Sequence, residues 1–377
     1  MQYRKMPCGR EKLSALGFGL MRLPVDAEHK IDEVKTLEML HYAHQKGVNY
    51  FDTAWGYHSE QSEPMLGKFL QQIDRKSVFV ATKLPTWLIK TRADMDDYLN
   101  RQLEKLGTTY IDYYLMHALN GKRWKELLKL GAIDFLEQAK ADGRIRHIGF
   151  SFHDKYPAFK FIVDSYDWEF CQIQHNFFDT KREAGTRGLL YAASKGMGII
   201  IMEPLMGGKL VGNVPADAEK VWQKSEHRWS PAERAFRFVW NYLQVQIVLS
   251  GMSNLEQVKE NIRIASAARA STLDEKELKL YNTVRRIYLK KMVVRCTGCG
   301  YCLPCPSQVG IPWALGVYND AHIFGDKQRH KWEYDFFLKD EYKADKCTRC
   351  GACIVKCPQK IDIPEELAKV AAYFSSD

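Results

Sequence analysis

Short apolar segments alternate along most of the chain with longer segments of helical period. The apolar segments are rich in β-branched and aromatic residues, as buried strands of parallel sheets are. They predict eight strands, near residues 16–19, 48–52, 78–83, 111–117, 145–151, 170–174, 198–202 and 247–249. The residues before the first of these strands, 1–15, are mixed in polarity and predict a small hairpin or lid.

Helical periodicity is clearest at 32–46, 59–72, 93–106 and 133–141. Ser230, Pro231 and Glu233 indicate a helix start, because serine caps, proline suits the first helical position and glutamate completes a capping box. The two longest connections, 118–131 and 205–229, are expected to be mobile loops.

Eight strand–helix units in about 270 residues are typical of a (β/α)8 TIM barrel. A doubly wound sheet is the alternative fold, but no G-x-G-x-x-G phosphate motif follows the first strand. The alternation stops near residue 272, and a helical stretch over 273–291 leads into a cysteine-rich region. We therefore expect a barrel over 1–285 and a small, mainly helical domain over 286–377.

Composition and net charge narrow the classes of function that this chain can have. The 377 residues are 46% hydrophobic and 27% charged, and the net charge of +9 is spread without a long basic run. This pattern argues against nucleic-acid binding. No signal peptide and no run of about 18 apolar residues is present, so we expect a cytoplasmic protein without a membrane partner.

Polar side chains end three consecutive predicted strands. Asp52 ends the second strand and Tyr57 follows it, Lys83 ends the third, and His117 ends the fourth. Each has an ordinary structural explanation, such as a turn cap or a satisfied core histidine. Because the carboxyl ends of barrel strands form the usual active-site face, the four together predict an acid/base site.

These residues occur in motifs that resemble the aldo-keto reductase superfamily over about residues 1–272. The motifs are Asn49-Tyr50-Phe51-Asp52-Thr53-Ala54 with Tyr57 and Glu60, Ala81-Thr82-Lys83, Leu115-Met116-His117, and Ile148-Gly149-Phe150-Ser151. The resemblance implies a (β/α)8 barrel that interconverts a carbonyl and an alcohol with NAD(P)H.

Hydride attack on a carbonyl leaves an alkoxide that needs a proton, and the resemblance makes Tyr57 the general acid. We expect the Lys83 ammonium to lower the pKa of Tyr57 from about 10. Asp52 would keep Lys83 charged and oriented. His117 would hydrogen-bond the carbonyl oxygen and orient it.

The same resemblance implies a nucleotide site. The implied residues are Gly19, Met21, Ser151, Gln174, Met202, Pro204, Leu205, Ser250, Gly251, Gln257, Glu260 and Asn261. Phe152 replaces the usual asparagine after Ser151, and Met202 replaces a stacking aromatic residue. Gly251, Met252 and Gln257 stand where many members carry basic residues for the 2′-phosphate, so we expect NADH or no strong preference over NADPH.

Eight of the ten cysteines lie in two similar runs. They are Cys296, Cys299, Cys302 and Cys305, followed by Pro306, and Cys347, Cys350, Cys353 and Cys357, followed by Pro358. The second run has the bacterial ferredoxin spacing, and the first has a last gap one residue shorter. Two 4Fe-4S clusters are predicted, and structural zinc is the alternative. The two-cluster ferredoxin rule would join each run's first three cysteines to the last cysteine of the other run.

Together these patterns predict an oxidoreductase acting on a small carbonyl or alcohol, with a ferredoxin or flavodoxin as candidate partner. Hydride carries two electrons and each cluster accepts one, so coupling would need an intermediary such as flavin. No flavin fingerprint is present, although a barrel can hold flavin without one. Alternatives are a ferredoxin-linked reductase, an electron-transfer subunit with an inactive barrel, or purely structural clusters.

Three aromatic residues, Trp55, Trp87 and Phe152, are candidates to line the substrate pocket.

Overall fold

The computed structural model describes residues 1–9, 11–212, 214–296, 298, 300–357 and 359–375. By packing, the chain divides into two compact units. The first contains Met1–Gly207 and Trp229–Asp274, and the second contains Gly208–Arg228 and Glu275–Asp377. These units do not coincide with the expected division at residue 285, because two segments before that residue pack with the C-terminal part of the chain.

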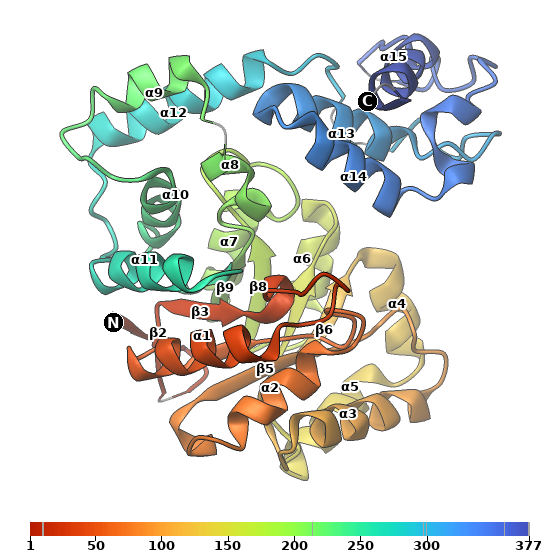
Figure 1. Ribbon diagram of the computed structural model, residues 1–377. Helices are drawn as coiled ribbons and strands as arrows, with labels where there is room; N and C mark the ends of the chain where they lie inside the picture. Colours follow the sequence, from red (N-terminus) through yellow and green to blue (C-terminus); the bar gives the residue numbers. More distant parts are fainter. Residues whose placement is uncertain (10, 213, 297, 299, 358, 376–377) are drawn as a thin grey trace. The chain divides into compact units, whose positions relative to one another are not determined.

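Eight parallel strands close into a barrel in the first unit (Figure 1), in the order β10-β3-β4-β5-β6-β7-β8-β9. The strands are β3 (Leu16–Gly19), β4 (Tyr50–Asp52), β5 (Phe79–Leu84), β6 (Ile111–Leu119), β7 (Ile145–Phe152), β8 (Phe170–Gln174), β9 (Gly198–Met202) and β10 (Val245–Gly251). The predicted barrel is confirmed, and β3, β8 and β9 match the prediction at both ends. These strands are almost wholly buried, which explains their continuous apolar character.

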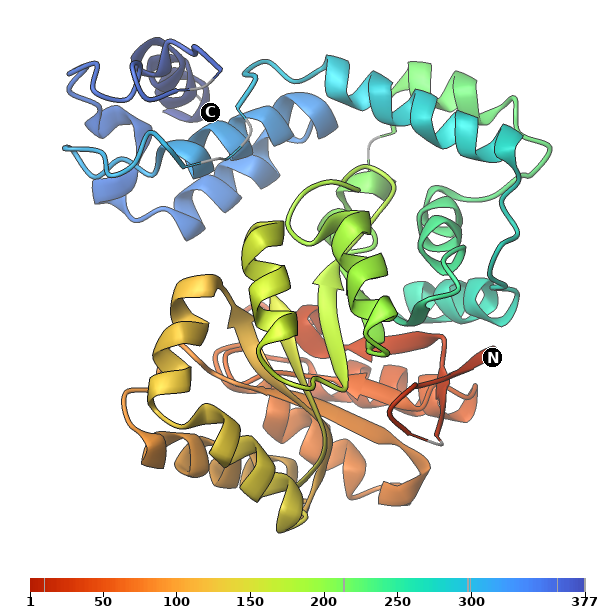
Figure 2. The ribbon, with the colours of Figure 1, turned by 180° about the vertical axis from the view of Figure 1, so that it is seen from behind.

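Helices lie outside the barrel strands, as Figure 1 and the rear view in Figure 2 show. They are α1 (Glu33–Gln45), α2 (Ser62–Leu70), α3 (Arg92–Leu106), α4 (Gly121–Lys129), α5 (Ala132–Ala141), α6 (Tyr156–Asp164), α7 (Gly185–Ser194), α10 (Pro231–Trp240) and α11 (Leu255–Ser266). The predicted start of α10 is confirmed, because the Ser230 side chain accepts a hydrogen bond from the backbone N–H of Glu233.

Helix α4 occupies a segment that was expected to be a loop. Asn120 caps it by accepting a hydrogen bond from the backbone N–H of Arg123 at 2.8 Å. Trp124 and Leu127, three residues apart, bury one face of the helix. The expectation of a loop over 118–131 was therefore wrong, because most of the segment forms a capped amphipathic helix that buries its apolar face.

A two-stranded hairpin precedes the barrel, as predicted. Strands β1 (Tyr3–Lys5) and β2 (Lys12–Ser14) pair antiparallel. Met6 and Leu13 from this hairpin are fully buried in one core cluster with residues near the starts of the barrel strands, including Tyr113. The hairpin therefore packs at the amino-terminal end of the barrel, away from the carboxyl ends of the strands.

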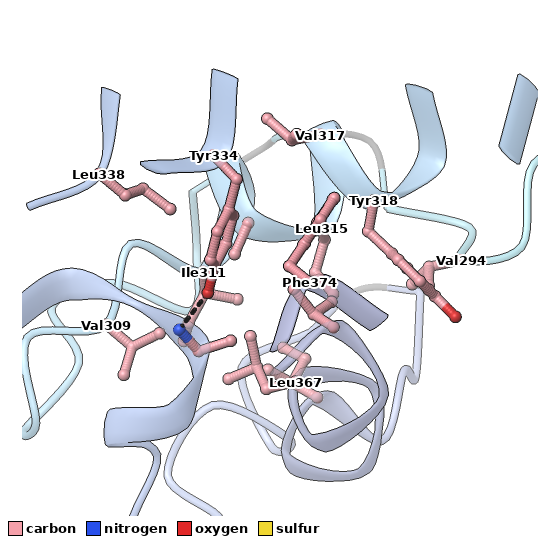
Figure 3. Packing of buried hydrophobic residues seen from close by; sticks show 14 of the residues in the cluster. Val294, Val309, Ile311, Leu315, Val317, Tyr318, Tyr334, Leu338, Leu367 and Phe374 are labelled. Atoms are coloured by element: carbon pink, nitrogen blue, oxygen red, sulfur yellow. Dashed lines mark hydrogen bonds between the residues drawn. The ribbon is translucent and has the colours of Figure 1, made fainter. Parts of the chain in front are cut away.

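The second unit is helical among its described residues. Its helices are α8 (Lys209–Gly212), α9 (Ala216–Trp222), α12 (Glu275–Lys290), α13 (Ile311–Phe324), α14 (Lys327–Phe337) and α15 (Ile363–Ser375). Figure 3 shows its apolar core, which includes Leu315, Leu367 and Phe374. Tyr334 lies in this core, and its hydroxyl accepts a hydrogen bond from the backbone N–H of Ala344 at 2.7 Å. Among the helices of the described residues, none is long and apolar enough to cross a membrane.

Candidate active site and cysteine pockets

The carboxyl ends of two adjacent strands bring Asp52 and Lys83 together. Asp52 ends β4, and Lys83 is the next-to-last residue of β5. The Lys83 ammonium donates to Asp52 Oδ1 at 2.7 Å and to the backbone oxygen of Thr53 at 2.7 Å. The Lys83 side chain is 0% exposed and that of Asp52 is 4% exposed. A buried charge requires such partners, so this ion pair fixes the position of the Lys83 ammonium.

Tyr57 and His117 lie beside this ion pair. The Lys83 ammonium donates to the Tyr57 hydroxyl at 3.5 Å and lies 5.0 Å from the center of the Tyr57 ring. The His117 ring is edge-on to the Tyr57 ring, with 6.1 Å between their centers. His117 Nδ1 is buried and has no hydrogen-bond partner among the described residues. The structure therefore brings all four predicted acid/base residues together.

The pKa of Tyr57 is raised, not lowered as expected from sequence. Burial is the largest cause, since it disfavours the charged phenolate. The Lys83 ammonium acts in the opposite direction, as predicted, but does not outweigh burial. Nearby carboxylates, including Glu203, raise the pKa further. Tyr57 is consequently a phenol at neutral pH and can donate a proton.

Lys83 is charged at neutral pH, whereas His117 is neutral. Burial lowers the pKa of Lys83, but Asp52 and Tyr57 outweigh it, so the net shift is upward and Lys83 stays an ammonium. Burial, followed by the Lys83 charge, holds the pKa of His117 well below 6.5. His117 is therefore a neutral imidazole that can hydrogen-bond a ligand without carrying charge.

A buried polar network behind Lys83 was missed from sequence. Glu63 on α2 is 0% exposed and accepts hydrogen bonds from Thr82 and from Gln102, each at 2.6 Å. Gln102 also donates to the backbone oxygen of Lys83 at 3.0 Å. The network holds β5 at the residue that carries the ammonium. In the sequence, the only sign of this network was a charged residue, Glu63, within an apolar stretch of a predicted helix.

Most of the predicted nucleotide residues lie near the carboxyl ends of barrel strands. Gln174 pairs with Met202 at the ends of β8 and β9, and Gly251 pairs with Gly19 at the ends of β10 and β3. Met21 lies just after β3, and Pro204 and Leu205 follow β9. The topology therefore collects residues from distant parts of the sequence on the face that holds Lys83.

Several of these side chains already have protein partners. Ser151 Oγ accepts a hydrogen bond from the backbone N–H of Ala118 at 2.7 Å. Asn261 donates to the Ser250 hydroxyl at 3.1 Å. The Glu260 carboxylate accepts a hydrogen bond from the Ser230 hydroxyl at 2.7 Å. The Gln257 side chain accepts one from the backbone N–H of Ser253 at 2.8 Å. Their roles toward a nucleotide stay predictions.

Arg22 is a cation near the predicted nucleotide residues that sequence reasoning missed. A Cβ on Gly251 would lie 3.2 Å from Arg22 Cβ, and the Ser253 hydroxyl donates to the backbone oxygen of Arg22 at 2.8 Å. The two segments are 231 residues apart in sequence. A closed barrel makes its first and last strands, β3 and β10, neighbours. The proximity of the two segments could have been predicted from that closure.

Of the three aromatic residues expected in a pocket, Trp87 has the position that fits. It is 45% exposed, and its ring center lies 5.0 Å from that of His117. Trp55 is buried beneath Lys105, whose ammonium lies 3.4 Å from its ring center. Phe152 is fully buried and packs against Phe159. Trp55 and Phe152 are instead packed in the protein interior, where little of either ring is exposed.

The cysteines of the second unit line two pockets. Cys305 from the first run shares one pocket with Cys347, Cys350 and Cys353 from the second. Cys357 from the second run shares the other with Cys296 and Cys302 from the first. Cys299 lies outside the described residues. All of the described cysteines have free thiols, so no disulfide competes with a metal for them. Each pocket therefore combines the last cysteine of one run with cysteines of the other run.

Comparisons with known proteins agree with this architecture. Residues 15–283 match the aldo/keto reductase family, and residues 295–361 match the 4Fe-4S dicluster domain. An NADH-specific methylglyoxal reductase of Escherichia coli is 24% identical over 310 residues, covering 69% of this chain and 92% of that protein. L-galactose dehydrogenase of Arabidopsis thaliana is 25% identical over 295 residues, covering 71% of this chain and 89% of that protein.

Solved structures share the barrel. An aldo-keto reductase from Bacillus halodurans in its holo form aligns with a TM-score of 0.63 at 21% identity, covering 75% of this chain and 96% of that one. An aldo-keto reductase from Klebsiella pneumoniae in complex with NADPH aligns with a TM-score of 0.62 at 17% identity, covering 75% and 95%. The family match covers most of the chain, so this protein belongs to the aldo/keto reductase family and carries a C-terminal 4Fe-4S dicluster domain.

Proposed function

We propose that the barrel interconverts a small carbonyl compound and its alcohol with NAD(P)H, and that the cysteine domain carries electrons on two 4Fe-4S clusters. The observation that carries the first part is the buried Asp52–Lys83 pair, with the Tyr57 hydroxyl 3.5 Å from the ammonium and a neutral His117 beside it. Family membership and the relatives named as reductases and dehydrogenases support it.

Each of the four side chains has a separate role in the proposed reaction. A bound nicotinamide supplies the hydride equivalent. His117, as a neutral imidazole, donates a hydrogen bond to the carbonyl oxygen and orients it. Tyr57 gives its phenolic proton to that oxygen as negative charge develops. Lys83 stabilises the resulting phenolate, and Asp52 keeps the ammonium in place.

The nucleotide residues fit a nicotinamide dinucleotide of either kind. Ser151 keeps its hydroxyl proton free to donate while its oxygen accepts from Ala118, and Gln174 lies near the same strand ends. Arg22 supplies one cation beside Gly251 for a 2′-phosphate. We propose that both NADH and NADPH bind, without the strong preference that a fork of several cations would give.

The two cysteine pockets suggest the ligand sets of the clusters. Cys305 with Cys347, Cys350 and Cys353 would hold one cluster, and Cys357 with Cys296, Cys299 and Cys302 the other. Apolar residues complete both pockets, including Ile311, Leu315 and Leu367, and such surroundings limit the access of water. Free thiols and clusters both require a reducing compartment, so we propose a cytoplasmic location and a ferredoxin or flavodoxin as electron partner.

The pKa directions predict how turnover depends on pH. Because burial raises the pKa of Tyr57 above 10, its acid form predominates through pH 7–9, and kcat for carbonyl reduction should stay flat there. Alcohol oxidation needs the phenolate, whose fraction rises about tenfold per pH unit below its pKa. We expect kcat for oxidation to rise with that slope. Both are measured in one buffer series, with circular dichroism as the control for folding. A fall in kcat for reduction between pH 7 and 8 would contradict the raised pKa.

The proposal is tested with anaerobic, cluster-loaded protein. NADH or NADPH is added first without substrate and then with an aromatic aldehyde, while nicotinamide and cluster absorbance are followed. We expect nicotinamide oxidation only with aldehyde present. Loss of cluster absorbance on adding nucleotide alone would show that hydride equivalents reach the clusters and would require a flavin or similar carrier. Absence of aldehyde turnover with both nucleotides, across a panel of aliphatic and aromatic aldehydes, would overturn the carbonyl reductase proposal.

A further inference from the structure

A second group of ionisable side chains lies at the opposite end of the barrel from Lys83. Cys8 lies between the two strands of the N-terminal hairpin, His147 lies near the start of β7, and Glu169 directly precedes β8. The proposed reaction at the carboxyl ends of the strands uses none of these three residues.

The three side chains converge on a small volume. One ligand atom of each, the Cys8 sulfur, a His147 ring nitrogen and a Glu169 carboxylate oxygen, lies within 4.8 Å of the other two. His147 Nδ1 is 2.7 Å from Glu169 Oε2, and His147 Nε2 is 3.6 Å from Glu11 Oε1. The side chains of His147 and Glu169 are only 12% and 17% exposed. Water therefore solvates this concentration of donor atoms poorly.

Unsatisfied polar atoms adjoin the cluster. Tyr113 is fully buried, and its hydroxyl has no hydrogen-bond partner in the described part of the chain. Its ring stacks on the His147 ring with 4.8 Å between centers. Cys8, Glu11 and Glu169 are among the groups whose charges act on that hydroxyl. Glu11 Oε2 is also buried without a partner among the described residues. Buried polar atoms normally find partners, so these two could contact a bound ion or the water that it carries.

We propose that Cys8, His147 and Glu169 bind a zinc ion that fastens the N-terminal hairpin to the floor of the barrel. Thiolate sulfur, imidazole nitrogen and carboxylate oxygen are the donors that zinc takes in proteins, and three of them leave one position of a tetrahedron for water. The Tyr113 hydroxyl is the buried polar group that would pair with that water. Glu11 Oε1, 3.6 Å from the second ring nitrogen, would orient the imidazole after moving within hydrogen-bond distance.

The donor spacing suits zinc after a small movement. Zinc bonds of about 2.1 Å to nitrogen and oxygen place two tetrahedral ligands about 3.4 Å apart. The 2.7 Å between His147 Nδ1 and Glu169 Oε2 must therefore open by about 0.7 Å. Glu169 Oε1 is anchored by the Lys140 ammonium at 2.6 Å and by the backbone N–H of Ile148 at 3.0 Å. Because Oε1 carries those contacts, Oε2, which now pairs with His147 Nδ1, is the oxygen that would bind the ion.

Zinc chloride binding to the intact, cluster-loaded protein tests this site. Loading the clusters first occupies the C-terminal cysteines, which would otherwise take up zinc. Equilibrium dialysis followed by metal analysis should find one zinc per wild-type chain, and zinc should raise the thermal unfolding midpoint. His147→Gln and Cys8→Ser should each weaken binding by at least about 100-fold and abolish the shift in midpoint.

Two further variants separate the site from effects on folding. Cys8→His should retain zinc, because imidazole replaces thiolate as a ligand. His153→Gln should bind zinc like wild type, since His153 also pairs with a glutamate, Glu183 at 3.2 Å, but belongs to no group of three metal-ligand side chains among the described residues. Absence of stoichiometric zinc in the wild type, or equal binding by His147→Gln, would overturn the proposal and leave the group as a hydrogen-bonded ion pair.

Discussion

Replacing Tyr57 by phenylalanine should lower kcat for carbonyl reduction by about 10² to 10⁴-fold, the usual contribution of a general acid. The change removes the hydroxyl 3.5 Å from the Lys83 ammonium but keeps the ring that packs edge-on to His117. Nucleotide affinity should be unchanged, because none of the predicted nucleotide contacts involves Tyr57. Steady-state turnover of an aromatic aldehyde and equilibrium dialysis of NADH and NADPH measure the two quantities.

Tyr42→Phe is the matched control for this variant. Tyr42 lies on α1, outside the barrel strands, and we expect its loss of a hydroxyl to leave kcat within about twofold of wild type, as for most surface substitutions. If Tyr57→Phe turned over as fast as Tyr42→Phe, the proton would have to come from another group, and the assignment of Tyr57 would be wrong.

Combining Cys305→Ser with Cys347→Ser should remove one cluster, whereas combining Cys305→Ser with Cys296→Ser should remove both. The first pair lines a single pocket, although the two residues belong to different cysteine runs. In the second pair, both residues belong to one run but line different pockets. Iron should therefore fall from about eight atoms per chain to about four in the first variant and close to zero in the second.

Iron and acid-labile sulfide, measured after anaerobic cluster loading, distinguish these outcomes. Cys171→Ala serves as the control, because this cysteine is buried in β8 of the barrel and should leave both clusters intact. The reverse result, two clusters lost in the Cys305/Cys347 variant and one in the Cys305/Cys296 variant, would mean that each run binds its own cluster. Zinc in place of iron in the wild type would instead support the structural zinc alternative.

The strands and the acid/base residues could be predicted because their signals are local. Buried parallel strands read as short apolar runs, and three of them match the structure at both ends. Asp52, Lys83 and His117 could be placed together from sequence because each lies near the end of such a run and neighbouring strands are consecutive in the barrel. The cysteine spacing, likewise, is a local pattern that points to ferredoxin-type chemistry whatever the surrounding fold.

Burial and long-range proximity were decided by the tertiary structure. The sequence showed Lys83 beside Tyr57 and predicted a lowered phenol pKa, but the degree of burial that reverses the shift depends on every element packed around the ring. Likewise, Glu63 is buried because α2 packs toward β5, which its own helical pattern does not reveal.

The same distinction explains the sites that sequence reasoning missed. Arg22 and Gly251 become neighbours because the barrel closes between its first and last strands, and Cys8 meets His147 because the hairpin folds onto the barrel floor. By itself, therefore, the sequence determined the fold class, the candidate acid/base residues and the cysteine runs, since periodicity and spacing are properties of short segments. Only the tertiary structure decided which distant residues meet and how much water reaches them, because both depend on how the whole chain packs.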